Sequence, residues 1–128
     1  MTGPEPRDWG ALAQLNFGPH ACYDATAYAG ISFWAKGPGR LFAGARGIDV
    51  TPRKWGGTCE QDCYNHHVKK IDLGGSWQRY ELLWTQLRQL GYAGKPLDPS
   101  ELNSLVFAVL APDTPFDIWI DDVAFTRP

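Results

Sequence analysis

The run GISFWAKG at residues 30–37 decides the fold class. Successive side chains of a β-strand point to opposite faces of a sheet, so this run predicts a strand with one buried face. Ile31, Phe33 and Ala35 share the apolar face, and polar residues alternate with them. Trp34 belongs to the polar set, and we therefore expect its side chain to lean toward solvent.

Short apolar or alternating runs bounded by Gly, Pro, Asn and Asp recur along the chain and read as strands. The 14 Gly and 10 Pro punctuate the connections between them, as is typical of sandwiches and barrels. Two short helical turns are expected, one within 85–90 and one that Asp98 would cap. We predict an all-β, jelly-roll β-sandwich of two antiparallel sheets. The predicted strands are Trp9–Phe17, Tyr28–Lys36, Leu41–Val50, His67–Leu73, Tyr80–Trp84, Leu105–Leu110 and Phe116–Phe125.

The length of 128 residues suits one core, and we expect a disordered segment at 1–8 followed by a single domain at 9–128. Hydrophobic residues make up 44% and charged residues 20% of the chain, as in ordinary soluble domains. The net charge of −2 argues against nucleic acid as a partner. No apolar run is long enough for a membrane span, and the first residues lack a signal-peptide pattern.

The aromatic residues, 6 Trp, 5 Tyr and 6 Phe, are the strongest functional signal. An aromatic ring packs against the C–H face of a sugar, while a few polar groups orient the hydroxyls. The alternative for each residue is that it fills the sandwich core. Alternation places Trp34 and Trp119 outward, and Tyr80 and Trp84 toward the core or a groove. Trp55 and Tyr64 fall in the loop around the cysteines, where an aromatic residue is easily presented to a ligand. The candidate ligand-binding residues are Trp34, Arg46, Trp55, Tyr64, His67, Tyr80, Trp84 and Trp119.

The loop GGTCEQDCYNHH at 56–67 combines Cys59 and Cys63 with His66 and His67. The cysteine spacing permits a short disulfide that would shape the loop. A zinc site is the alternative, but adjacent histidines on a strand point to opposite faces and do not readily hold one ion. Cys22 is left over, and we expect it to be a buried free cysteine that behaves as a small apolar residue.

Asp121 and Asp122 in the last strand-like run supply hard oxygens of the kind that calcium prefers. A calcium site needs more oxygens than two residues provide. The same pair fits poorly with glycoside hydrolysis, which requires two carboxylates that face each other across a cleft. The sequence also lacks the short motifs of common hydrolases, phosphate loops and zinc proteases.

Residues 28–37, then 77–80 followed by 87–92, and finally 116–125 together resemble the galactose-binding-like jelly rolls found as carbohydrate-binding modules in bacterial polysaccharide-degrading proteins. The resemblance implies a non-catalytic binder of a plant-type polysaccharide such as β-glucan, secreted or extracellular, and joined to other domains of a larger protein. A domain of this family requires no cofactor but often holds a structural calcium ion. Asp121 or Asp122 matches the calcium ligand that the family takes from its last strand. The family's acidic partner near the first strand has no match here, and an edge left open by a missing first strand would invite self-pairing.

Two alternatives remain. A small polysaccharide-active enzyme would need a centre built from His20, His66, His67 or the aspartates. A structural or protein-interaction domain would gather its outward aromatics into a flat apolar patch rather than a groove.

Overall fold

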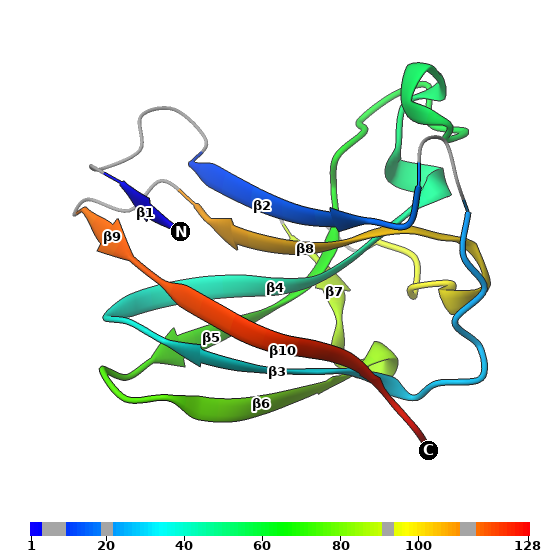
Figure 1. The fold of residues 1–128 in the computed structure, drawn as a ribbon. Helices are drawn as coiled ribbons and strands as arrows, with labels where there is room; N and C mark the ends of the chain where they lie inside the picture. Colours follow the sequence, from blue (N-terminus) through cyan, green and yellow to red (C-terminus); the bar gives the residue numbers. More distant parts are fainter. Residues whose placement is uncertain (4–9, 19–21, 91–93, 111–114) are drawn as a thin grey trace.

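The computed structural model describes residues 1–3, 10–18, 22–90, 94–110 and 115–128, which form short antiparallel strands joined by turns (Figure 1). The strands are β1 (Thr2–Gly3), β2 (Ala11–Asn16), β3 (Gly30–Lys36), β4 (Gly39–Gly47), β5 (His67–Leu73), β6 (Gln78–Leu83), β7 (Arg88–Gln89), β8 (Leu102–Val109), β9 (Phe116–Asp117) and β10 (Trp119–Thr126). Four 3₁₀ turns occur in the same segments: η1 (Ile48–Val50), η2 (Arg53–Trp55), η3 (Trp84–Gln86) and η4 (Pro99–Glu101). No helix in these segments is long and apolar enough to cross a bilayer.

Two sheets form the layers of the sandwich. The larger sheet has the order β2-β8-β4-β5-β7, and the smaller has the order β10-β3-β6. Every strand pairing within them is antiparallel. The chain passes between the layers, since β3 lies in the smaller sheet, β4 and β5 in the larger, and β6 in the smaller again (Figure 1). The predicted all-β sandwich of two antiparallel sheets is therefore confirmed.

The core lies between the two sheets and is built from the apolar face of each strand. Ile31, Phe33 and Ala35 of β3 are fully buried, as the alternation predicts. The Phe33 ring meets Phe107 of the opposite sheet edge to face, with ring centroids 5.2 Å apart. This contact joins the central strand of the smaller sheet to β8 of the larger sheet.

An aromatic stack closes one end of the sandwich. The ring of Phe125 on β10 stacks on Tyr23, Tyr28 and Phe17, with ring centroids 4.8 to 5.9 Å apart. Trp84 meets the same ring edge to face, and its indole N–H donates to the carbonyl of Tyr28 at 2.9 Å. The stack explains much of the aromatic content as core packing at this end.

The predicted strands agree with the observed ones within a few residues, apart from the part of Trp9–Phe17 that lies outside the described residues. The Asp98 side chain caps η4 by accepting from the Ser100 N–H at 2.9 Å, as expected. The helical turn expected within 85–90 is only partly present, because η3 ends at Gln86 and Arg88–Gln89 form β7, which pairs with β5. The structure also adds η1, η2 and β1, which the sequence did not indicate. Thr2 and Gly3 in β1 pair with β9, although they belong to the segment predicted to be disordered.

We predict that Phe33→Ala lowers the free energy of unfolding by about 3 to 5 kcal/mol, because it leaves a cavity at the contact between the layers. Leu15→Ala is the control, since Leu15 is 48% exposed and should change stability by less than about 1 kcal/mol. Urea denaturation measures both. Equal losses for the two variants would contradict the assignment of Phe33 to the core.

Candidate functional site

A cleft of about 860 Å³ lies over the outer face of the larger sheet. The register pairs Leu12 with Ala108 and Asn16 with Ser104, so the lining changes from apolar at one end to polar at the other. Of the ligand-binding residues predicted from the sequence, the cleft brings together Arg46, Trp55 and Tyr64. Its lining is Leu12, Gln14, Asn16, Gly18, Arg46, Trp55, Tyr64, His66, Asn103, Ala108 and Leu110.

Arg46 is the buried cation of the cleft. It is only 8% exposed, and its Nε donates to the side-chain oxygen Oδ1 of Asn103 at 3.0 Å, while Nη2 donates to the same atom. In the described part of the chain no carboxylate lies within ion-pair distance of Arg46. A guanidinium has five N–H groups, so the amide of Asn103 leaves Arg46 with further donors for a ligand in the cleft.

The connection between β4 and β5 carries Trp55 and Tyr64, which are 52% and 49% exposed (Figure 1, green). Backbone hydrogen bonds hold this loop in shape. Tyr64 N–H donates to the Val50 carbonyl at 2.8 Å, and Cys59 N–H donates to the Thr51 carbonyl at 3.0 Å. Because both bonds join the outer part of the loop to the segment that leaves β4, the two aromatic side chains are presented from a defined support.

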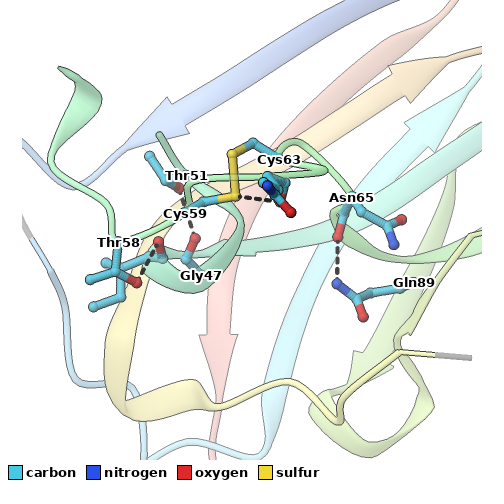
Figure 2. Close-up of a disulfide and its surroundings, with 9 residues drawn as sticks. Gly47, Thr51, Thr58, Cys59, Cys63, Asn65 and Gln89 are labelled. Carbon is cyan, nitrogen blue, oxygen red and sulfur yellow. Dashed lines mark hydrogen bonds between the residues drawn. A yellow bond between two sulfur atoms is a disulfide. The ribbon is translucent and has the colours of Figure 1, made fainter. Parts of the chain in front are cut away.

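The disulfide between Cys59 and Cys63 is present, as predicted, with Cα atoms 5.8 Å apart (Figure 2). It closes the tip of the same loop, one residue before Tyr64. At the base, the Thr51 hydroxyl donates to the Gly47 carbonyl at 2.7 Å, and the Gln89 amide donates to the Asn65 carbonyl at 3.0 Å. The loop is thus tied at its tip and at both ends.

Gly57 allows a close approach within this loop. A Cβ atom added there would lie 1.8 Å from the Thr51 carbonyl oxygen, which no side chain can tolerate. The preceding residue, Gly56, ends η2 with a left-handed backbone conformation, φ 86°. The pair of glycines is needed to turn the chain directly after Trp55.

His66 lines the cleft as a neutral base. Burial, with smaller contributions from the charges of Arg46 and His67, lowers the pKa of the His66 imidazole from 6.5 to about 4. Its ring meets Tyr64 edge to face with centroids 6.4 Å apart. Among the described residues that line the cleft, Arg46 is therefore the one cation at neutral pH, and the imidazole beside it is uncharged.

His67, Tyr80 and Trp84 lie away from the cleft. His67 is fully buried on the opposite side of its strand from His66, and its Nε2 hydrogen-bonds the Lys95 carbonyl at 2.7 Å. Tyr80 packs against Phe33 on the core side of β6, and Trp84 belongs to the aromatic stack and is 6% exposed. Trp84 also borders a second hollow with Arg88 and Lys95.

Trp34 and Trp119 point outward as predicted, but from the other sheet. They lie on the outer face of β10-β3-β6, where Asp121 pairs with Trp34 and Lys36 pairs with Trp119. The residues predicted as one site are thus divided between the outer faces of two different sheets.

Asp121 and Asp122 lie at the start of an irregularity in β10, where the register with β3 shifts between Asp121 and Ala124. The Asp121 carboxylate accepts from the Asp122 N–H at 2.8 Å, and Asp122 has a left-handed backbone, φ 50°. Among the described residues no group of three or more His, Cys, Asp and Glu side chains is arranged to hold a metal. These two aspartates alone do not supply the oxygens that calcium requires, and a structural calcium ion stays an untested expectation.

The prediction for Cys22 was wrong. Its thiol is free as expected, but the residue is exposed rather than buried, with Sγ 3.8 Å from the Ser100 carbonyl oxygen. Cys22 precedes a single bridging residue, Tyr23, and does not lie in a strand whose inner face would bury it. His20, considered for a catalytic centre, lies outside the described residues.

Sequence reasoning missed part of the cleft, including Gln14, Asn16, Asn103 and the role of His66 as a lining residue. The alternation in Ala11–Asn16 does contain a signal, because Gln14 and Asn16 share a face that Ala11 and Ala13 do not. Asn103 had no such signal, since it lies at an irregularity in the pairing of β4 with β8. Only the strand order brings it beside Arg46.

We predict that stability falls between pH 6.5 and about 4 because of His66. The unfolded chain takes up a proton at the ordinary pKa of 6.5, whereas the folded chain resists protonation until about pH 4. Stability is therefore full above pH 6.5 and is lost as pH falls, by at most about 3 kcal/mol. Urea denaturation of the wild type and of His66→Gln at pH 7 and pH 4.5 measures this. If the free energies of unfolding of the wild type and of His66→Gln differ by the same amount at pH 7 and at pH 4.5, the prediction is contradicted.

We predict that Cys59→Ser/Cys63→Ser lowers the free energy of unfolding by about 2 kcal/mol, because the short cross-link restricts the unfolded chain only modestly. Hydrogen exchange should speed up at the backbone amides of positions 59 and 64 and stay unchanged in β8. Cys22→Ser is the control and should leave both measurements unchanged, since Cys22 is free and exposed. If hydrogen exchange in the loop stays slow in the variant that lacks the disulfide, the prediction is contradicted, and the backbone hydrogen bonds are enough to hold the loop in shape.

No protein-family model matches the sequence, and no curated protein matches it. Solved structures do match the fold. The family 11 carbohydrate-binding module of a cellulosomal cellulase of Clostridium thermocellum is 20% identical, with a TM-score of 0.62 over 94% of this chain and 67% of that one. The Clostridium thermocellum module in complex with a β-1,3-1,4-mixed-linked tetrasaccharide is 20% identical, with a TM-score of 0.60 over 93% of this chain and 68% of the other. The chain therefore has the β-sandwich fold of family 11 carbohydrate-binding modules.

Proposed function

We propose that this domain binds polysaccharide without cleaving it, in the cleft over the larger sheet. The observation that carries the proposal is the convergence of exposed Trp55 and Tyr64 with buried Arg46 on one open cleft. Aromatic faces receive the C–H surface of a sugar ring, and the Arg46 donors meet its hydroxyls. Gln14 and Asn16, on the strand at the cleft's edge, add amide groups that both donate and accept.

The charge of the cleft favours a neutral ligand. Arg46 is its one cation among the described lining residues at neutral pH, and His66 is uncharged there. An anionic polymer would find little positive charge to hold it, whereas hydroxyls need only hydrogen-bond partners. A neutral glucan fits this balance.

The composition of the lining also supports binding over hydrolysis. Glycoside hydrolysis uses a pair of carboxylates that flank the bond to be cleaved. The described residues that line the cleft include no Asp or Glu. A catalytic pair would have to come from another part of the molecule.

The fold likeness supports β-glucan as the class of ligand, since one of the similar modules was solved with a mixed-linked β-1,3-1,4 tetrasaccharide. The disulfide supports an oxidising, extracellular location. We infer that the domain works as a module of a larger secreted protein and delivers that protein to its polysaccharide.

We predict that Trp55→Ala and Tyr64→Ala each weaken binding to mixed-linkage glucan about fivefold, because each removes one ring contact worth about 1 kcal/mol. Arg46→Lys should also weaken binding, since an ammonium lacks the planar donors of a guanidinium. Leu83→Ala, on the other sheet, is the control with unchanged binding.

The measurement is retention on cellulose, xylan and mixed-linkage glucan, together with an assay of the supernatant for new sugar ends. Retention without new ends supports the proposal. Released sugar would overturn the non-catalytic function, and wild-type retention by the Trp55 and Tyr64 variants would overturn the location of the site.

A further inference from the structure

The outer face of the smaller sheet carries exposed tryptophans that the cleft does not use. Trp34 is 40% exposed, Trp77 is 40% exposed and Trp119 is 53% exposed. We refer to these three residues as the tryptophan face. They come from the central strand β3, from the residue before β6, and from β10, so they span the whole width of the sheet (Figure 1).

Strand register places the indoles of Trp34 and Trp119 on the same side. Trp34 pairs with Asp121 on one neighbour and with Arg79 on the other, and directly paired residues share a face. Trp119 pairs with Lys36, two residues beyond Trp34 on the same face of β3. The opposite side of β3 is fully buried in the core, so this face is turned away from the core and from the cleft.

Lys36 links the other two indoles. Its Nζ lies 5.2 Å from the centroid of the Trp77 ring and 5.5 Å from that of Trp119, within the range of cation–π attraction. Trp77 therefore also lies on this face. Lys36 places one cation beside both rings and helps to hold them in position.

The polar groups among the indoles are balanced in charge. Arg79 donates to Glu81 at 3.2 Å, and Asp121 lies across from Trp34. Lys36 and Arg79 are therefore matched in charge by Glu81 and Asp121 among the described residues that lie beside these indoles. A strongly anionic or cationic ligand gains little binding energy from a surface with balanced charges. A protein partner also fits this face poorly, because the centre of a protein interface is usually depleted of charged residues. Separated aromatic rings with donors and acceptors between them suit a neutral ligand rich in hydroxyls.

We propose that the tryptophan face is a second carbohydrate-binding surface, separate from the cleft, that takes a neutral polysaccharide chain. The rings of Trp77 and Trp119 contact sugar rings, and Lys36 and Arg79 donate to hydroxyls. Because the two surfaces lie on outer faces of opposite sheets, one domain engages two chain segments at once, and polymer binding exceeds the affinity of either site alone.

The test uses the full chain with Trp77→Ala/Trp119→Ala, with the cleft pair Trp55→Ala/Tyr64→Ala, and with all four substitutions. Leu83→Ala is the matched control, because Leu83 is an exposed apolar residue at the other end of the same face. Circular dichroism verifies folding, and the substituted side chains are exposed in each case. The probes are insoluble cellulose and mixed-linkage glucan for retention, and a mixed-linked tetrasaccharide for NMR of the indole N–H signals.

We expect the tryptophan-face pair to lower retention on polysaccharide about tenfold, the cleft pair to leave residual binding, and all four substitutions together to abolish it. In the cleft variant, the tetrasaccharide should still shift the indole signals of Trp77 and Trp119. If the cleft pair has no effect while the tryptophan-face pair abolishes binding, the proposed cleft fails and this proposal stands.

Other results overturn the second surface. Wild-type retention by the tryptophan-face pair, with unshifted indole signals, would leave the cleft as the binding site. A different outcome is that the Trp77/Trp119 variant keeps wild-type retention but loses a self-association that sedimentation detects in the wild type. This face would then be an interface between copies of the chain.

Discussion

Ile31, Phe33 and Ala35 are buried against the larger sheet, and this burial turns the side chains that alternate with them in β3 toward the outer face. Once Phe33 meets Phe107 across the layers, Trp34 must face solvent. The neighbouring strands follow through their pairing with β3, which places Arg79 and Asp121 on the same outer side. The core therefore determines which residues are available on the outside of the smaller sheet.

The same constraint acts on the larger sheet with a different result. Leu41, Ala43 and Ala45 of β4 fill the core, which leaves Arg46 on the outer side. There the β4–β5 connection contributes Trp55 and Tyr64 to the cleft, whereas on the outer side of the smaller sheet Trp34, Trp77 and Trp119 are 40% to 53% exposed. One layer thus carries a walled site, and the other an open surface.

Local patterns in the sequence were sufficient for the longer strands, for the directions of Trp34 and Trp119, and for the disulfide, but not for the two-residue strands β1 and β7. These features depend on residues within a few positions of one another, as does the cap that Asp98 forms on η4. The division of the candidate aromatics between two faces was not accessible in this way. Trp34 and Trp55 both read as exposed, but only the strand order shows that they belong to different sheets.

The cleft itself depends on contacts between distant parts of the chain. Arg46 and Asn103 are adjacent because β4 pairs with β8, and no spacing in the sequence encodes that pairing. The two histidines illustrate the same limit. Their opposite directions followed from alternation, but it took the structure to show that His66 lines the cleft while His67 is buried against the Lys95 carbonyl.

The backbone support of the β4–β5 loop has an evolutionary consequence. Two of the bonds that shape the loop join main-chain atoms of Val50, Thr51, Cys59 and Tyr64, and the other ties are the disulfide and the side chains of Thr51 and Gln89. The side chains of Trp55 and Tyr64 take no part in those bonds. Selection can therefore exchange the two rings for other residues and retune what the domain recognises while the loop keeps its shape, which makes this segment a natural place for ligand preference to diverge.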